Sequence, residues 1–288
     1  LRQQAHICDW DGMKADAAAI TELGVSGEPV SPFAMLPLED NPARHRIRSE
    51  RFARKKYRHT PMPPRPRLAS RPKRLRIGYF SADFHDHATM HLMARLFETH
   101  DRRRFALHAY SYGPNTRDAM RARAEAAFDV FNDVRDLSDG AAAERVRSDA
   151  IDVAVDLKGY TTDGRLGVLA HRPAPVQISY IGYPGTIGAP FIDYIVADET
   201  VIPTASRQHY CERIIYLPHS YQVNDDTRPI SDRAMTRAEA GLPEHAFVFC
   251  CFNNTFKISA AEFDVWTRLL RKVDGSVLWL FHANSSAA

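Results

Sequence analysis

From Arg74 onward the sequence alternates between short apolar runs and segments of helical periodicity, and this alternation constrains the fold more than any other feature. The apolar runs predict strands at residues 74–81, 105–113, 151–160, 175–186, 192–198 and 213–220. Helices are expected at 87–99, 116–128 and 139–149, with Thr116 and Ser138 as N-caps of the second and third helices. This order is typical of an α/β fold in which a parallel, doubly wound sheet carries helices on both faces.

A second unit of the same kind begins further along the chain. Predicted strands at 246–253 and 276–281 flank a predicted helix at 258–273. One β-α-β unit cannot bury both faces of its sheet, so we expect a second lobe that is only begun in this sequence. The predicted domains are a helical and Pro-rich linker at 1–73, a complete Rossmann-like lobe at 74–238 and the start of another lobe at 239–288.

Composition and charge are those of a soluble globular protein, with 44% hydrophobic and 25% charged residues. No apolar run is long enough to span a membrane. The four cysteines have neither disulfide-framework nor metal-site spacing, so we expect a cytoplasmic protein. The basic segment 43–77 could bind nucleic acid, but it leads into a Pro-rich stretch without an aromatic stacking platform. We therefore expect a solvated linker, and no nucleic-acid or membrane partner.

Polar residues cluster after several predicted strands, where doubly wound sheets place their ligand sites. The first cluster contains Asp83, His85, Asp86, His87, Thr89 and His91. Three imidazoles could bind a metal, but no carboxylate or thiol cluster clearly completes the set, so no metal site is predicted. For His87 two interpretations stay open, namely a general base or substrate ligand, and a capping residue that packs at a helix start.

Three further clusters follow later strands. Asp156, Lys158, Gly159 and Tyr160 form either part of a ligand site or a local ion pair that stabilises a turn. The loop at 182–190, with Pro184, Gly185 and Thr186, is rich in glycine and proline and could offer backbone N–H groups to a phosphate or a sugar. His219 and Tyr221 follow the strand at 213–220.

The turn FNNTFKIS at 252–259 joins the first strand and the helix of the second unit. In doubly wound sheets this turn approaches the anionic part of a nucleotide, assisted by the helix N-terminus. Lys257 in this turn would supply a counter-charge for a diphosphate, and the alternative is a solvated lysine.

Several blocks of the sequence together resemble the protein O-GlcNAc transferase family. They are RLRIGYFSADFHDHATMHLM, LKGYTTDGR, HRPAPVQISYIGYPGTIGAPFIDYIVAD, YLPHSYQVND and FVFCCFNNTFKISAAEFDVWTRLLRKVDGSVLWL. The resemblance implies two facing Rossmann-like lobes of the glycosyltransferase B type. It also implies inverting, metal-independent transfer of N-acetylglucosamine from UDP-GlcNAc to Ser/Thr hydroxyls of proteins, with no cofactor. The segment DFHDHATMH resembles that of bacterial members of this family. The QQAHICDW segment resembles the connector after a tetratricopeptide array.

The resemblance also implies roles for single residues. His87 matches a histidine near the acceptor site that was favoured as general base, although Asp156 or the donor phosphate could take the proton instead. Lys257 matches the lysine that holds the donor diphosphate, and Asn254 a position that contacts the uridine or phosphate. Pro184, Gly185 and Thr186 match the loop near the sugar. We add Lys158, Tyr160 and His219 as further substrate-binding candidates.

The resemblance finally sets the expected partners and the alternatives. The family's phosphate-binding His-Thr-Thr helix start has no counterpart here, so we expect the chain alone to be inactive. Its expected partners are a UDP-sugar, acceptor proteins and the remaining C-terminal catalytic lobe. A related protein O-fucosyltransferase using GDP-fucose and a non-catalytic interaction scaffold are the alternative functions.

Overall fold

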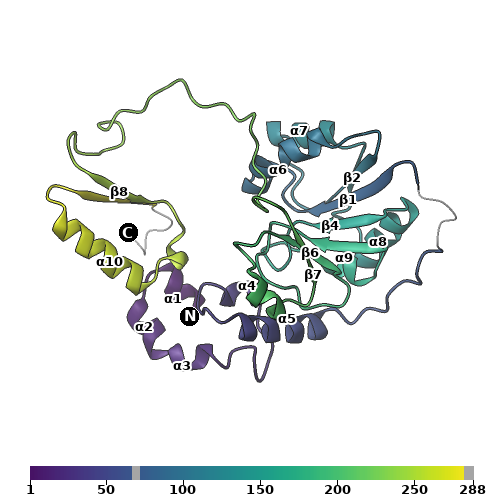
Figure 1. Ribbon diagram of the computed structural model, residues 1–288, viewed down its shortest axis with the longest axis horizontal. Helices are drawn as coiled ribbons and strands as arrows, with labels where there is room; N and C mark the ends of the chain where they lie inside the picture. The colour runs from purple at the N-terminus through teal and green to yellow at the C-terminus, as the bar shows by residue number, and fades with distance from the viewer. Residues whose placement is uncertain (67–71, 282–288) are drawn as a thin grey trace. The chain divides into compact units, whose positions relative to one another are not determined.

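The computed structural model describes residues 1–66 and 72–281 (Figure 1). The chain forms two compact units, which we describe separately. The larger unit contains Gly24–Phe33 and Asn41–Arg228, and the smaller unit contains Leu1–Leu23, Ala34–Asp40 and the chain from Pro229 onward. The segment 1–23, which the sequence analysis assigns to a linker, thus belongs to the same unit as the strands and helix that follow Pro229.

The larger unit is built on a seven-stranded sheet with the order β3-β2-β1-β4-β5-β6-β7, and every pair of neighbours is parallel. Its strands are β1 (Leu75–Ser81), β2 (Phe105–Ser111), β3 (Val130–Asp133), β4 (Val153–Asp156), β5 (Val176–Ser179), β6 (Tyr194–Ala197) and β7 (Arg213–Tyr216). From the central pair of β1 and β4, strands β2 and β3 follow toward one edge of the sheet. Strands β5, β6 and β7 follow toward the other edge. This arrangement confirms the predicted doubly wound α/β sheet.

Helices cover both faces of this sheet. They are α5 (Pro42–Lys56), α6 (Ala88–Thr99), α7 (Ala119–Ala127), α8 (Asp139–Ser148) and α9 (Gly167–Ala170), with the 3₁₀ helix η1 (Thr204–His209). Figure 1 shows α6 and α7 on one side of the sheet and α8 and α9 on the other. Met93 and Phe97 of α6 are fully buried in the core of the first face. On the other face Phe80 stacks on Tyr110, with ring centroids 4.6 Å apart.

The structure corrects three local expectations. Ser138 caps α8 as predicted, but Thr116 does not cap α7, because Asp118 accepts from the Arg121 backbone N–H (2.8 Å) and the helix starts at Ala119. Strand β3 is an addition to the predicted set. The expectation of a solvated linker does not hold for α5, because Arg48 and Ser49 are completely buried.

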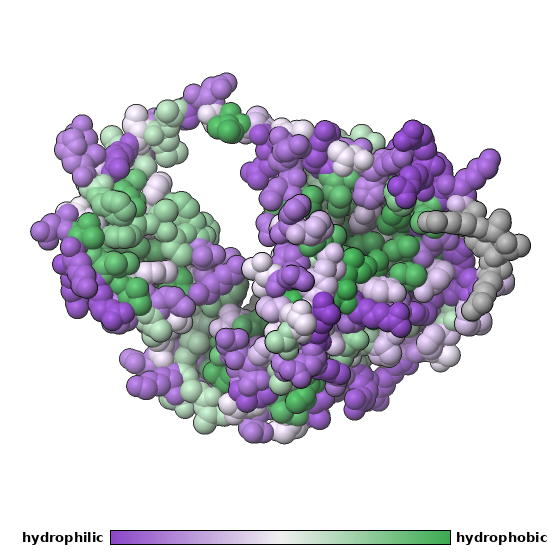
Figure 2. Space-filling view, viewed as in Figure 1, coloured by the Kyte–Doolittle hydropathy of each residue, from purple (hydrophilic) through white to green (hydrophobic). Residues whose placement is uncertain are grey.

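The smaller unit pairs β8 (Val248–Cys251) with β9 (Val277–Leu280) in parallel, through η2 (Thr255–Lys257) and α10 (Ala260–Lys272), which confirms the predicted β-α-β order. It also contains α1 (Arg2–His6), α2 (Trp10–Ala15) and α3 (Ala17–Ile20), while α4 (Pro32–Met35) spans the division between the units. Large apolar side chains remain exposed in the β8–α10 region, as Figure 2 shows; among them are Phe247, Phe252, Val265 and Leu269.

Candidate active site

The carboxyl ends of β1 and β4 form the switch point of the sheet, where the strand order reverses. The two strands pair in parallel, with Phe80 opposite Asp156. Loops leaving β1 and β4 turn to opposite faces, and the crevice between such loops is the usual ligand position in doubly wound folds. The first two predicted clusters of polar residues are therefore neighbours in space.

A buried ion pair joins these two loops. The Lys158 ammonium lies 2.8 and 3.0 Å from the two carboxylate oxygens of Asp83, and each side chain is only 7% exposed. Asp83 also accepts a hydrogen bond from the Thr89 hydroxyl (3.2 Å). The sequence pattern had indicated no role for Asp83 and had allowed for a local ion pair within the 156–160 turn. The pair instead links β1 to β4, between residues distant in sequence.

His87 stands at the start of α6 beside this pair. Its Nδ1 accepts a hydrogen bond from the Thr89 backbone N–H (3.1 Å) and lies 3.4 Å from Asp83. Its side chain is 42% exposed, so the ring both caps the helix and faces solvent. Burial is the main reason why the pKa of His87 is lowered, and Lys158 lowers it further. Both open interpretations of His87 are thus compatible with its position.

The other two histidines of this cluster have separate surroundings. His91 Nε2 lies 2.7 Å from an Asp86 carboxylate oxygen, and the His85 ring lies 5.7 Å from the His87 ring. Within residues 1–66 and 72–281 no group of three or more His, Cys, Asp or Glu side chains is arranged to hold a metal ion.

Asp156 lies beneath the turn that carries Lys158. Its carboxylate accepts from the Gly159 backbone N–H (2.6 Å), and the residue is only 2% exposed. Burial raises the pKa of Asp156 to about 6, against the effect of hydrogen bonds from the turn. Gly159 has a φ of +56°, and a Cβ atom there would come within 2.4 Å of the Tyr183 Cβ. Asp156 and Gly159 thus fix the turn, while a catalytic role of Asp156 stays a prediction.

The loop at 182–190 packs against the same turn. A Cβ atom at Gly182 would lie 1.9 Å from the Leu157 carbonyl oxygen, which shows how closely the two backbones approach. Tyr160 donates to the Ile187 carbonyl (2.6 Å), and Thr186 donates to the Glu212 carboxylate (2.6 Å). Both side chains are buried, so they shape the loop from within.

The rest of this loop remains accessible. Pro184 is exposed and Gly185 is partly exposed, and the Pro184 carbonyl lies 3.5 Å from the Tyr210 hydroxyl that donates to it. Sequence reasoning missed Glu212, which also accepts from the Ile187 backbone N–H (2.6 Å). A buried glutamate more than twenty residues from the loop gives no local pattern that could have indicated this role. His219 is exposed after the carboxyl end of β7.

Asn254 and Lys257 lie in the smaller unit, in the turn between β8 and α10, and both are exposed. The N-terminal segment holds this turn. The Thr255 hydroxyl donates to the His6 carbonyl (2.6 Å), and Trp10 Nε1 donates to the Ile258 carbonyl (3.1 Å). A capping box of Ser259 and Glu262 then starts α10. The turn therefore presents a lysine beside the positive end of a 13-residue helix.

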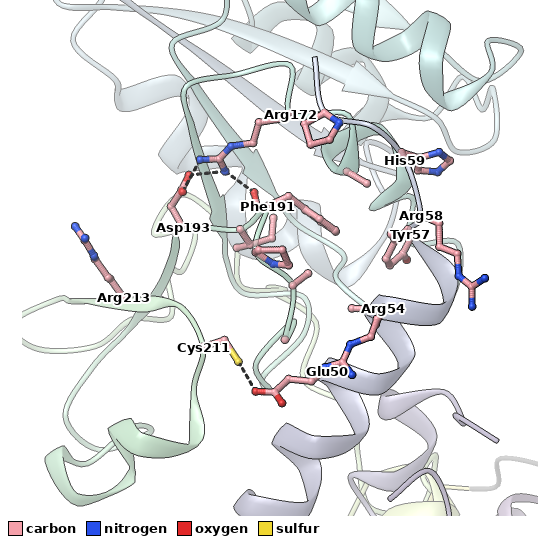
Figure 3. A pocket seen from close by; sticks show the side chains of 17 residues that line it. Glu50, Arg54, Tyr57, Arg58, His59, Arg172, Phe191, Asp193, Cys211 and Arg213 are labelled. Atoms are coloured by element: carbon pink, nitrogen blue, oxygen red, sulfur yellow. Dashed lines mark hydrogen bonds and ion pairs between the residues drawn. The ribbon is translucent and has the colours of Figure 1, made fainter. Parts of the chain in front are cut away.

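A cavity of about 990 Å³ in the larger unit lies away from this chemistry (Figure 3). It is lined by residues of α5 and by Asp193 and Arg213, at the amino ends of β6 and β7. Arg172 is already paired with Asp193 (2.6 Å), and Glu50 accepts from the Cys211 thiol (3.1 Å). Because the switch point is at the opposite ends of the strands, we place the candidate active site there and not in the cavity.

The sequence matches the profile of glycosyl transferase family 41 over residues 52–232 and 229–287. The chain belongs to this family. In the residues that the structure describes, no helix is long and apolar enough to cross a membrane.

Individual glycosyl transferase family 41 relatives support the assignment. The chain is 36% identical over 258 residues to the probable UDP-N-acetylglucosamine--peptide N-acetylglucosaminyltransferase SEC of Arabidopsis thaliana, covering 88% of this chain and 26% of that protein. It is 25% identical over 320 residues to the UDP-N-acetylglucosamine--peptide N-acetylglucosaminyltransferase of Caenorhabditis elegans. That match covers 72% of this chain and 28% of the other protein. The chain thus spans about a quarter of the length of these relatives.

A solved structure of the family confirms the fold. The O-GlcNAc transferase mutant K341M of Thermobaculum terrenum superposes with a TM-score of 0.73 at 30% sequence identity. The match covers 94% of this chain and 48% of that one. The predicted glycosyltransferase fold of the B type is therefore confirmed.

Proposed function

We propose that the protein transfers N-acetylglucosamine from UDP-N-acetylglucosamine to Ser or Thr hydroxyl groups of acceptor proteins. In this reaction the hydroxyl oxygen bonds to C1 of the sugar with inversion, and the bond from C1 to the phosphate oxygen breaks. UDP leaves with the electron pair, and the hydroxyl proton is released. The names of the family 41 relatives favour this reaction over the GDP-fucose alternative and over a non-catalytic scaffold.

The observation that carries the proposal is the exposed Lys257 at the start of α10. Departure of UDP without a metal requires fixed cations and N–H groups for the charge that develops on the diphosphate. Lys257 provides an ammonium, and the α10 N-terminus provides the positive end of a helix dipole. Asn254, also exposed, adds an amide for the uridine or the phosphate.

We assign the acceptor side to the switch point of the larger unit. His87 offers an exposed ring edge, and Lys158 and Asp83 hold the two loops that shape the crevice. The accessible backbone of Pro184 and Gly185 would contact the sugar. Tyr160 and Thr186 act here as supports of the loop, and His219 is a further candidate for contact with substrate.

We further propose no cofactor and no metal, a cytoplasmic location, a bacterial origin and an associated tetratricopeptide region. These proposals rest on the cysteine pattern and on the sequence blocks described above. In the smaller unit, α10 buries none of its residues, and we propose that this unit works together with the remaining C-terminal catalytic lobe.

Calorimetric titration of the full-length protein with UDP tests the donor site. Lys257→Ala should weaken UDP binding about tenfold or more, because a hydrogen bond to a charged group is lost. Lys272→Ala is the matched control, since it removes an exposed lysine from the other end of α10 and should bind UDP normally. Equal affinities of both variants and the unmodified protein would remove Lys257 from the donor site.

A further inference from the structure

The cavity of about 990 Å³ in the larger unit has an apolar wall and a charged rim (Figure 3). Tyr57 packs against Phe191 in this wall, with ring centroids 5.6 Å apart and ring planes at 89°. Pockets for small organic ligands have volumes of about 300–1,000 Å³ and mostly apolar linings with a few polar groups. The wall is completed by buried small or apolar residues, namely Ala53, Ala170, Ala189 and Ile192. The cavity thus has the size and the wall of a small-molecule site.

The two carboxylates that line the cavity are already paired. Asp193 accepts hydrogen bonds from two nitrogens of the Arg172 guanidinium, at 2.6 and 3.0 Å. Glu50 accepts from Arg46 Nε (2.8 Å) and from the Cys211 thiol (3.1 Å). Each carboxylate therefore has a donor of its own, and neither is left to neutralise a further cation.

The arginines of the rim are left without such partners. Arg54, Arg58 and Arg213 line the cavity, and Figure 3 shows Arg213 on one side and the other two across from it. In the part of the chain that the structure describes, none of the three forms an ion pair, and the Tyr57 hydroxyl forms no hydrogen bond. Four arginines face two carboxylates around this cavity, so the rim carries excess positive charge.

We propose that this cavity binds a small phosphate ester that carries a flat ring, of about the size of a mononucleotide. The planar guanidinium groups of Arg58 and Arg213 offer paired N–H donors, which match phosphate oxygens. One carboxylate would satisfy a single arginine, whereas a phosphate group brings three acceptor oxygens and nearly two charges. The ring would pack against Tyr57 and Phe191.

This site is separate from the candidate active site. The cavity lies at the amino ends of β6 and β7, and the switch point lies at the carboxyl ends of the strands. The proposal therefore does not depend on the proposed transferase function.

Calorimetric titration of the full-length protein tests the ligand class with three probes. Adenosine monophosphate carries the ring and the phosphate, ribose 5-phosphate lacks the ring, and adenosine lacks the phosphate. We expect adenosine monophosphate to bind about tenfold or more tightly than either of the other two, because only it uses both the wall and the rim. Equal affinities of the three probes, or no binding of adenosine monophosphate, would overturn the proposal.

Single variants then locate the binding. Arg58→Ala and Arg213→Ala should each weaken binding of adenosine monophosphate about tenfold or more, because a hydrogen bond to a charged group is lost. Both side chains are exposed and unpaired, so thermal unfolding of these variants should stay unchanged. Lys55→Ala is the matched control, since Lys55 is an exposed cation of α5 that pairs with Glu28 and does not line the cavity.

Two results would contradict the location. Binding that persists in both arginine variants and is lost in Lys257→Ala would assign the nucleotide to the proposed donor site. An equal loss in Lys55→Ala and in the arginine variants would show attraction to general positive charge and no built site.

Discussion

At the scale of single residues, the site depends on groups that are costly to bury. Lys158 and Asp83 are each 7% exposed, and burying two charges is favourable only when they are well paired and hydrogen bonded. Two Asp83 oxygens contact the ammonium and one also accepts from Thr89. We infer that this pair fixes the loop geometry at the switch point more than it adds stability.

Removing one member of the pair should therefore be severe. Lys158→Met leaves the Asp83 charge buried, and we expect a loss of about 3–5 kcal/mol in the free energy of unfolding. Adding Asp83→Asn to this variant should recover part of the loss, because the unpaired charge is gone. Urea unfolding of the two single variants and the double variant measures the coupling, and strictly additive losses would contradict a direct interaction.

Gly159 is the second residue whose identity the structure explains. Its φ is +56°, and a Cβ would meet the Tyr183 side chain at 2.4 Å. Gly159→Ala should lower the free energy of unfolding by about 2–4 kcal/mol through strain and overpacking. Gly27→Ala, at φ +57° with nothing within 4 Å of its Cβ, should cost only about 1 kcal/mol. Equal losses in the two variants would show that the Tyr183 contact does not matter.

At the scale of helices and strands, the apolar and periodic patterns predicted the elements because those patterns reflect local burial. Strand β3, with the sequence VFND, was missed because it is short and half polar. The Thr116 cap was wrong because Asp118 competes two residues later, and an aspartate accepts the helix N–H equally well.

Contacts between distant parts of the chain could not be predicted in this way. Trp10 and Ile258 are 248 residues apart, and Asp83 and Lys158 are 75 apart. The spacing of apolar residues and the secondary-structure propensities depend on residues close together in the sequence. They therefore located the loops of the site without showing which side chains contact one another. Residue type and position indicated the counter-charge role of Lys257, and the roles of the other single residues came from the resemblance to a family.

The N-terminal segment should support the donor loop of the same unit. Trp10→Phe keeps the ring contact with Phe263 but loses the N–H that donates to Ile258. We expect UDP binding to weaken about fivefold, because the loop loses one hydrogen bond. Trp266→Phe, which removes an indole from α10, is the control. Unchanged UDP affinity in Trp10→Phe would show that the loop holds its shape without this contact.

At the scale of the whole molecule, titrating groups of the larger unit make its stability depend on pH. Burial is the main reason why the pKa values of His87, His100, His108 and His171 are lowered. The unfolded chain then binds more protons than the folded one, so these groups contribute stability above the ordinary pKa of 6.5 that is lost as pH falls through the lowered values.

The contribution of Asp156 to stability changes with pH in the opposite direction. Its pKa is raised to about 6, so its contribution is present below the ordinary value of 3.8 and is lost as pH rises through 6. Burial also raises the pKa of Glu212, so the four histidines act against two carboxyl groups. Because the histidines are more numerous, we expect the urea midpoint to fall between about pH 7.5 and pH 5.5. Asp156→Asn should make this fall steeper by removing one of the opposing groups. A midpoint that rises on acidification would contradict the assignment of these groups.

We propose that this family 41 chain belongs to an enzyme that uses UDP-N-acetylglucosamine and needs Lys257 but no metal. The most direct measurement is transfer of labelled sugar to Ser or Thr of a protein acceptor by the full-length protein, in the presence of a chelator. We predict transfer from UDP-N-acetylglucosamine and not from GDP-fucose, with loss of transfer in Lys257→Ala and normal transfer in Lys272→Ala. Transfer of fucose, dependence on a metal, or full activity of Lys257→Ala would contradict the claim.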